Sequence, residues 1–337
     1  MPSVYFSKEY NIYVLTKYED VKEALKNSTI FSSSQGNLIV ESKHRFGRTL
    51  GASDNPNHDI YKNIVKEAYS KTRIDSILAD FPFSFDIEKD SARFTARILN
   101  MPYDEEYISS LIQHIQKHCD KNVLHNIDNS AYDTIIQLCK DNKPQDALGV
   151  YKCFLDANGL ILSLVSGPTL SGTLSTTGAI QMMIKDLAEN QDQYRQLVKD
   201  KRLIPNAVNE CIRFNTSTGR FSRTLTKDHM INGFQLRKGD RVALCLDAAN
   251  RDESIFEKAN NFDITRDTSA SLGFGYGLHS CIALYLTKAF MVRYLEELTK
   301  KYESFTLENM NPDYLITAAG NFDAFSDKII IKHLTKL

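Results

Sequence analysis

The most constraining feature of this chain is a single cysteine at the end of a glycine-rich loop, in the stretch Phe274-Gly275-Tyr276-Gly277-Leu278-His279-Ser280-Cys281. Glycines reach backbone conformations that are closed to other residues, so the loop can turn tightly and direct amide N–H groups at the sulfur. From Ile282 onward, apolar residues recur with helical spacing, which predicts a helix whose positive end faces Cys281. Such a position lowers the pKa of a thiol and makes it a metal ligand. The sequence therefore predicts a thiolate site at Cys281.

This loop resembles the haem-binding loop of the cytochrome P450 family, which reads aromatic-Gly-x-Gly-x-His-x-Cys. The resemblance implies that Cys281 is the axial ligand of haem iron, that His279 contacts a haem propionate and that the motif's aromatic residue, Phe274, binds the cofactor. The family usually has glycine two residues after the cysteine, where this chain has Ala283. The alternative is a buried structural cysteine in a glycine-rich turn, which is the usual fate of an isolated cysteine.

A second group of residues resembles the part of the family that holds the haem propionates. His58 and Lys62 are four residues apart and face the same direction from a predicted helix. The family has a His-x-x-x-Arg pair here, and Lys62 replaces its arginine with a point charge that lacks the guanidinium fork. Arg223 resembles the remaining propionate arginine of the family. A lone histidine on a helix is more often a solvated or core residue, which is the alternative for His58.

Glu210 and Arg213 lie three residues apart on a predicted helix and can pair on one face. An exposed pair of this kind contributes about 1 kcal/mol or less. The pair also comes before the cysteine loop in the sequence. In this it resembles the Glu-x-x-Arg pair that holds the polypeptide behind the haem in cytochromes P450. The family's third partner is an arginine that aligns here with Asn261, so either Arg251 substitutes for it or the network is smaller.

The family's oxygen-activating motif, Ala/Gly-Gly-x-Asp/Glu-Thr, has its best match in the stretch Ser166-Gly167-Pro168-Thr169-Leu170-Ser171. Thr169 stands at the position of the acid and Leu170 at that of the threonine, so Thr169 or Ser171 would have to offer the catalytic hydroxyl. Pro168 removes an amide donor and should kink the helix or open it, which would let dioxygen and water approach the iron. Alternatively, Gly167 and Pro168 end one helix and Thr169 caps the next.

We expect substrate contacts from two segments of the chain. One is the long helix around this motif, and the other is the segment 215–221. The predicted substrate residues are Val165, Ser166, Leu170 and Thr218.

Composition excludes several other classes of protein. A net charge of -1 gives no overall attraction to nucleic acid or to an anionic membrane surface. The six cysteines form no CxxC pair and no signal peptide precedes them, which favours a reduced cytoplasmic compartment over a zinc ribbon or a secreted framework. The longest apolar run worth testing, Gly159 to Val165, is far shorter than the about twenty residues of a membrane span.

The pattern along the chain predicts a mainly α protein with a small β region. Expected elements are a strand over 11–16, helices over 18–25, 56–69 and 205–214, helical segments over 74–148 and 150–187, a hairpin joining 231–236 to 241–246 through the turn 238–240, an irregular segment over 247–273, a helix from 282 to about 302, and strands near 315 and 329–332. No repeat or linker interrupts the pattern, so we expect a single domain over residues 1–337.

The resemblance implies a cytochrome P450 fold that binds haem b and catalyses monooxygenation of a small apolar substrate with dioxygen. Electrons would come from a ferredoxin-like donor that docks near the face of Lys288 and Arg293. Three alternatives stay open: a peroxide-driven enzyme, a haem-thiolate protein that binds ligands without turnover, and a haem-free protein.

Overall fold

The computed structural model describes residues 2–41, 46–47, 49–66, 69–99, 173–316, 323–325 and 329–336. Six of the predicted site residues lie outside these ranges: Val165, Ser166, Pro168, Thr169, Leu170 and Ser171. The single domain expected over residues 1–337 also stays a prediction, because the described ranges omit 100–172.

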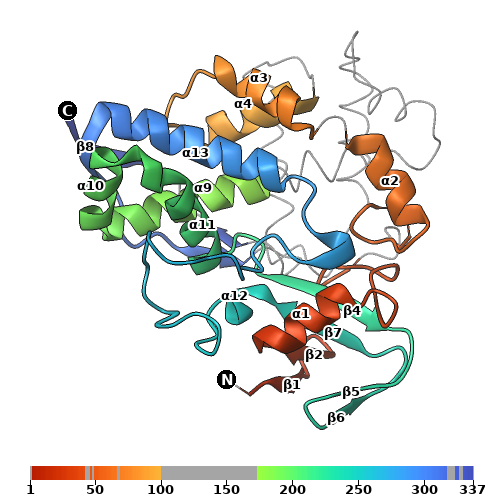
Figure 1. The fold of residues 1–337 in the computed structure, drawn as a ribbon. Helices are drawn as coiled ribbons and strands as arrows, with labels where there is room; N and C mark the ends of the chain where they lie inside the picture. Colours follow the sequence, from red (N-terminus) through yellow and green to blue (C-terminus); the bar gives the residue numbers. More distant parts are fainter. Residues whose placement is uncertain are drawn as a thin grey trace.

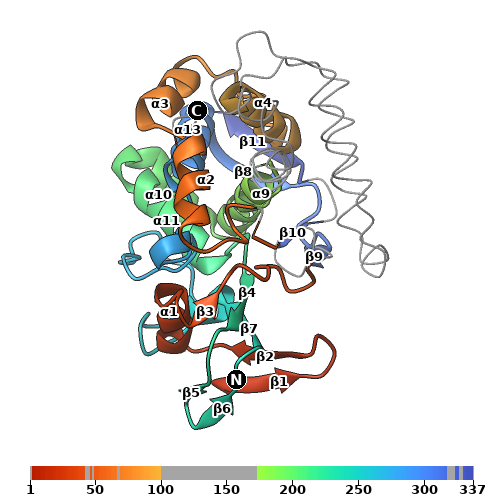
Figure 2. The same cartoon turned by 90° about the vertical axis from the view of Figure 1, so that its right-hand side faces the viewer.

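Helices dominate the described part of the chain, and most of them gather at one end of the molecule. The largest sheet lies at the other end, beside the helices over 18–26 and 246–249 (Figures 1 and 2). The mainly α prediction with a small β region is confirmed. The helices are α1 (Tyr18–Lys26), α2 (Asn57–Val65), α3 (Lys71–Ala79), α4 (Ile87–Leu99), α9 (Thr173–Glu189), α10 (Gln191–Lys199), α11 (Ile204–Phe214), α12 (Leu246–Ala249) and α13 (Leu284–Lys301), with short 3-10 turns at η4 (Lys201–Leu203) and η5 (Gly277–His279).

The helical end is built around α13, whose buried face contacts α3, α10 and α11. Phe290 of α13 stacks on Phe94 of α4, with ring centroids 4.2 Å apart and nearly parallel planes. Leu295 and Leu298 continue the same face and are fully buried. Burying such side chains stabilises the fold by roughly 1.5–3 kcal/mol each. This packing fixes the helix that follows Cys281.

A five-stranded sheet in the order β1-β2-β7-β4-β3 forms the other end of the molecule. Its strands are β1 (Val4–Ser7), β2 (Ile12–Leu15), β3 (Phe31–Ser32), β4 (Arg220–Leu225) and β7 (Arg241–Cys245). β7 pairs in parallel with β2 and antiparallel with β4, which carries the predicted site residue Arg223. Smaller pairs are formed by β8 (Tyr302–Leu307) with β11 (Ile331–Lys336) and by β9 (Tyr314–Ile316) with β10 (Asp323–Phe325).

The predicted hairpin between residues 231–236 and 241–246 is wrong. The segment 231–236, predicted as one strand, instead belongs to a separate hairpin. In it, β5 (His229–Ile231) pairs with β6 (Phe234–Leu236). Asn232 and Gly233 turn the chain with φ values of 47° and 81°. Two consecutive residues with positive φ form the tight turn that matches the twist of a hairpin, and Asn-Gly is its strongest sequence signal.

Two helix boundaries also differ from the prediction. The helix expected over 56–69 ends at Val65, and the N–H of Tyr69 donates instead to the carbonyl of Lys66 at 3.2 Å. The helix after the cysteine begins at Leu284, not at Ile282. None of the helices in the described ranges combines the length and apolar character that crossing a membrane requires.

Candidate active site

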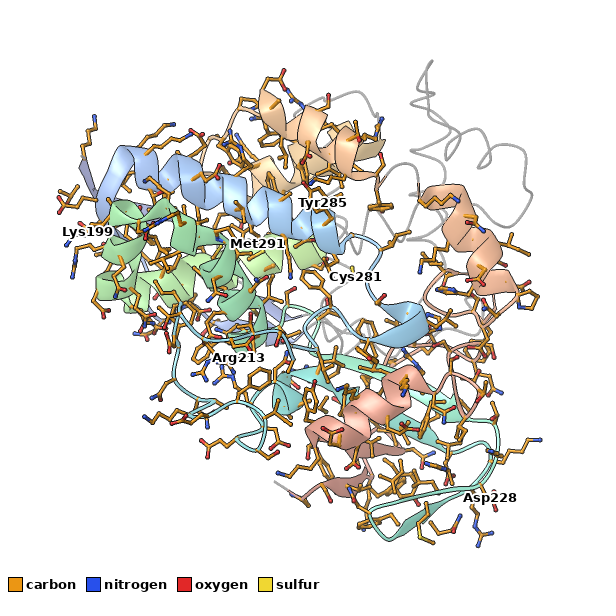
Figure 3. The ribbon with its side chains drawn as sticks, viewed as in Figure 1. Lys199, Arg213, Asp228, Cys281, Tyr285 and Met291 are labelled. Atoms are coloured by element: carbon orange, nitrogen blue, oxygen red, sulfur yellow. The ribbon has the colours of Figure 1, made fainter. Side chains whose placement is uncertain are left out.

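The cysteine loop is closed by its own backbone. The N–H of Cys281 donates to the carbonyl of Phe274 at 2.9 Å, and the N–H of Ser280 donates to the carbonyl of Gly277 at 3.1 Å. Gly275 and Gly277 hold positive φ values of 69° and 72°, which residues with a Cβ rarely adopt. Figure 3 shows that Cys281 lies beside the amino-terminal end of α13, between the helices and the large sheet.

Glycine also lets the loop approach two neighbouring helices closely. A Cβ on Gly277 would lie 2.8 Å from the carbonyl oxygen of Leu25, at the end of α1. A Cβ on Gly273, just before the loop, would lie 2.6 Å from the Cγ2 of Ile212 in α11. The loop is therefore held between α1 and α11, and these contacts position Cys281.

The Cys281 thiol does not have the lowered pKa that the sequence predicted. Surrounding protein raises the pKa of Cys281 to about 11, although the amide of Ala283 opposes this shift. Because α13 begins only at Leu284, its first turn does not start at the sulfur. Cys281 nevertheless has exposed surface.

Four residues that were predicted to hold propionates form one cluster. The rings of His58 and His279 meet edge to face, with centroids 4.5 Å apart. Burial lowers the pKa of His279 to about 2, and Arg223, His58 and Lys62 add to this shift by their positive charge. The structure thus brings together residues from α2, β4 and the cysteine loop.

This cluster contains buried groups that its neighbours balance only in part: Asp54 acts on Arg223, but burial has the larger effect on the Arg223 pKa. Arg223 is 3% exposed, burial lowers its pKa to about 10, and its side chain donates to the carbonyl of Ser222 at 2.7 Å. The Nε2 atom of His279 is buried without a hydrogen-bond partner in the described residues. A buried cation and a buried polar nitrogen are costly unless an anion or acceptor meets them. Two carboxylates beside a thiol would satisfy both, so these residues fit haem.

The other predicted cofactor and substrate residues have less defined surroundings. Phe274 packs against the helical core, with the Nζ of Lys288 lying 5.6 Å from its ring centroid. Thr218 is half-buried in the segment between α11 and β4.

Sequence reasoning missed Tyr69, whose phenol pKa is raised by burial and by the nearby Cys281. Its position after the end of α2 gave no sign of this contact.

Glu210 and Arg213 form a buried, bidentate ion pair instead of an exposed one. Arg213 donates from Nε to Oε2 at 2.7 Å and from Nη2 to Oε1 at 2.8 Å, and both side chains are fully buried. The Nη1 of Arg213 also donates to the carbonyls of Asn250 (2.7 Å) and Ala259 (2.9 Å). The pair thus holds the irregular segment between β7 and the cysteine loop.

The third partner of this pair is Arg266, which the sequence analysis did not identify. Its Nε lies 3.3 Å from Oε1 of Glu210, and its Nη2 donates to the carbonyl of Asn261 at 3.1 Å. Arg251, the predicted substitute, instead donates to the carbonyl of Phe214 and stacks on its ring at 3.7 Å. The signal for Arg266 was its place in the same irregular segment, five residues after Asn261.

The residues gathered around Cys281 are compatible with a haem-thiolate centre. Comparison with known families agrees, because the family model described as cytochrome P450 matches residues 45–317. The chain belongs to the cytochrome P450 family.

Curated relatives match the chain over different lengths. Cytochrome P450-terp of Pseudomonas sp is 36% identical over 152 residues, which cover 45% of this chain and 35% of that protein. The biotin biosynthesis cytochrome P450 of Bacillus subtilis is 26% identical and aligns with 81% of this chain and 72% of its own length. Cytochrome P450(BM-1) of Priestia megaterium is 26% identical, with coverages of 94% and 88%. The match with the Pseudomonas protein thus spans about a third of that relative.

Solved structures share the fold at low sequence identity. CYP109E1 from Bacillus megaterium in complex with testosterone has a TM-score of 0.84 at 19% identity and covers 99% of this chain and 95% of its own. P450BioI in complex with hexadec-9Z-enoic acid ligated acyl carrier protein has a TM-score of 0.79 at 20% identity, with coverages of 98% and 94%. The predicted cytochrome P450 fold is confirmed.

Proposed function

We propose that this protein is a haem-thiolate monooxygenase that inserts one oxygen atom of O2 into a small apolar organic substrate. Its cofactor is haem b, and its electrons come from a separate ferredoxin-like protein. One observation carries the proposal: the exposed Cys281 shares a loop with His279, whose buried Nε2 has no hydrogen-bond partner among the described residues and lies near the cations of Arg223 and Lys62. Family membership supports it.

In this proposal the sulfur of Cys281 ligates the iron and the positive cluster holds the propionates. Arg223 and His279 bring the charge and the free nitrogen, while His58 and Lys62 approach from α2. When bound, haem supplies the oxidative chemistry, and the thiolate favours cleavage of the O–O bond by donating electron density. The protein supplies position, charge and the exclusion of water.

The buried glutamate and arginine pair stabilises the cysteine loop through a chain of hydrogen bonds. Arg213 donates to the carbonyl of Asn250, and the side-chain oxygen of Asn250 accepts the N–H of Leu272 at 2.8 Å. The carbonyl of Leu272 in turn accepts the N–H of Gly275 at 2.8 Å. The pair therefore acts on Cys281 by holding the backbone that leads to it.

The proposed oxygen and substrate residues lie mainly outside the described residues. Pro168 would open the helix for dioxygen and water, and a hydroxyl from Thr169 or Ser171 would help to deliver protons. Val165, Ser166, Leu170 and Thr218 would contact substrate. A Pro168→Ala variant tests the first role: unchanged turnover and an unchanged lifetime of the dioxygen complex would remove Pro168 from the mechanism.

The proposed docking surface for the electron donor shifts from the predicted face of α13 to α1. Arg293 is already paired with Glu296 at 2.6 Å, and Lys288 is half-buried. Lys22 of α1 lies 5.6 Å from the ring centroid of Tyr276, which is 42% exposed in the cysteine loop. A positive group beside an exposed aromatic ring fits an acidic protein partner.

A cytoplasmic location fits the cysteine pattern and remains part of the proposal.

Turnover experiments test the proposed activity against its alternatives. Purified protein is supplied with a ferredoxin, its reductase and a pyridine nucleotide, or with hydrogen peroxide alone. The panel contains a steroid, a terpene and a fatty acid, because similar proteins include a testosterone complex, one named P450-terp and one bound to an acylated carrier protein. Products are analysed by mass spectrometry after incubation with isotopically labelled dioxygen.

We expect label from dioxygen in the product when the donor system is present. Turnover only with peroxide would instead establish a peroxide-driven enzyme. Ligands that shift the Soret band but never yield product would indicate a binding protein.

A further inference from the structure

Ser33 is fully buried, yet its hydroxyl has no hydrogen-bond partner in the described part of the chain. It follows β3 directly, at the edge of the five-stranded sheet. A hydroxyl that is buried without a partner carries a desolvation cost, and native proteins keep few such groups. The unmet hydroxyl of Ser33 therefore needs a reason.

The pairing of β3 with β4 brings Ser33 beside one of the predicted propionate residues. Ser32 lies opposite Thr224 in this antiparallel pair, and the register, continued by one residue, brings Ser33 opposite Arg223. Residues that lie opposite one another on paired strands share a face of the sheet, with Cβ atoms about 4.5–5.5 Å apart. Ser33 is 0% exposed and Arg223 3%. An unmet hydroxyl and a buried guanidinium group therefore lie side by side.

Asp54 fixes the backbone of Ser33 in this place. The N–H of Ser33 donates to Oδ1 of Asp54 at 2.9 Å. Burial lowers the pKa of Arg223 and of His58, and the nearby charge of Asp54 opposes both shifts. Ser33 thus shares an anionic neighbour with two of the residues that were predicted to hold propionates.

A second buried polar atom without a partner belongs to the same group of residues. It is Nε2 of His279, whose surroundings include both Arg223 and His58. The hydroxyl of Ser33 and this nitrogen therefore gather around one arginine from different segments of the chain. An anionic group beside Arg223 would satisfy both.

We propose that Ser33 is a further haem-binding residue, whose hydroxyl donates a hydrogen bond to the propionate that Arg223 holds. This proposal rests on the proposed function only in that the chain binds haem b. A carboxylate is a strong acceptor for a hydroxyl proton. Because the hydroxyl is uncharged, it adds a contact without adding repulsion to Arg223 and Lys62. Lys62 brings a point charge without the guanidinium fork, so one more donor compensates for the lost one.

A serine elsewhere in the chain provides a matched control. Ser91 of α4 is also fully buried, and its hydroxyl also has no partner within the described residues. Ser33→Ala and Ser91→Ala therefore remove the same atom from equally buried sites. Only Ser33 lies beside Arg223.

The primary measurement is the rate at which the haem-bound full-length protein releases haem b to apomyoglobin. We expect Ser33→Ala to release haem about tenfold faster than wild type, because a hydrogen bond to a charged group is lost. Ser91→Ala should release it at the wild-type rate. An unchanged rate in Ser33→Ala would overturn the proposal, as would an equal acceleration in Ser91→Ala.

A second cofactor separates a propionate contact from a packing effect. The same proteins are loaded with an iron porphyrin that carries ethyl groups in place of both propionates. Ser33→Ala then has no propionate contact to lose, so it should release this porphyrin at the wild-type rate. Equal acceleration with both cofactors would assign the effect to packing and overturn the proposal.

A third cofactor separates this proposal from the proposed function. Metal-free protoporphyrin IX keeps both propionates and lacks iron, so its release, followed by fluorescence, does not depend on ligation by Cys281. If no substrate is turned over or Cys281 does not bind the iron, the proposed function fails, yet faster release of this porphyrin from Ser33→Ala still supports the role of Ser33. Equal release from wild type and Ser33→Ala overturns that role, and a wild-type chain that binds none of these porphyrins overturns both proposals.

Discussion

Glu210→Gln should be one of the most destabilising single changes in the described part of the chain. Glu210 is fully buried and accepts hydrogen bonds from two arginines and from the N–H of Asp263, at 2.7 to 3.3 Å. The substitution keeps the shape but removes the carboxylate charge that pairs directly with Arg213. Arg213 is also fully buried. Breaking one side of a buried ion pair typically costs about 3–5 kcal/mol.

That loss is large compared with the about 5–15 kcal/mol by which folded proteins are usually stable. The assay is urea unfolding followed by far-ultraviolet circular dichroism, at equal haem occupancy. Glu296→Gln is the control, because Glu296 pairs with Arg293 at 2.6 Å while both side chains are about one third exposed. The control should lose less than about 1 kcal/mol. If Glu210→Gln lost no more than Glu296→Gln, the account of the buried network would be refuted.

Three further predictions follow from other parts of the structure. Gly277→Ala should destabilise the protein more than Gly275→Ala in the same unfolding assay. Both glycines hold positive φ, but only at Gly277 would the new Cβ lie 2.8 Å from a backbone oxygen. Equal losses of stability would contradict the packing of the loop against α1. Burial raises the pKa of Asp186 in the folded protein well above its ordinary value of 3.8. The protonated side chain therefore stabilises the fold fully below pH 3.8, and this stabilisation is lost as the pH rises toward the folded-state pKa. Asp186→Asn should therefore gain stability over wild type as pH rises from about 4 to 8, and a constant difference would contradict a buried neutral acid. Arg223→Leu should release haem to apomyoglobin at least about tenfold faster, whereas the exposed Arg237→Leu should not, and equal rates would argue against a propionate contact.

Local sequence chemistry predicted the parts of the site that depend on a few neighbouring residues. The glycines around Tyr276 do hold positive φ, and the helix that carries Glu210 and Arg213 does run to Phe214. The spacing of Leu286 and Phe290 predicted a helix after the cysteine because helical periodicity is a local property.

Features that depend on distant segments could not be predicted in this way. The partner Arg266 meets Glu210 only because the irregular segment folds back over α11. Burial has the largest effect on the pKa of Cys281, and burial depends on how the whole chain packs, so the loop alone suggested the wrong direction. The hairpin at Asn232 and Gly233 was mispredicted for a different reason. Its Asn-Gly turn is a local signal, but the prediction assigned these two residues to a strand.

The most direct test of the whole account is the absorption spectrum of the reduced protein with carbon monoxide. We predict that wild-type protein reconstituted with haem gives the red-shifted Soret band of a thiolate-ligated complex. Cys281→Ala should lack this band, while Cys245→Ala, which removes another thiol with accessible surface, should keep it. The same band in Cys281→Ala would show that the sulfur at this position does not bind the iron.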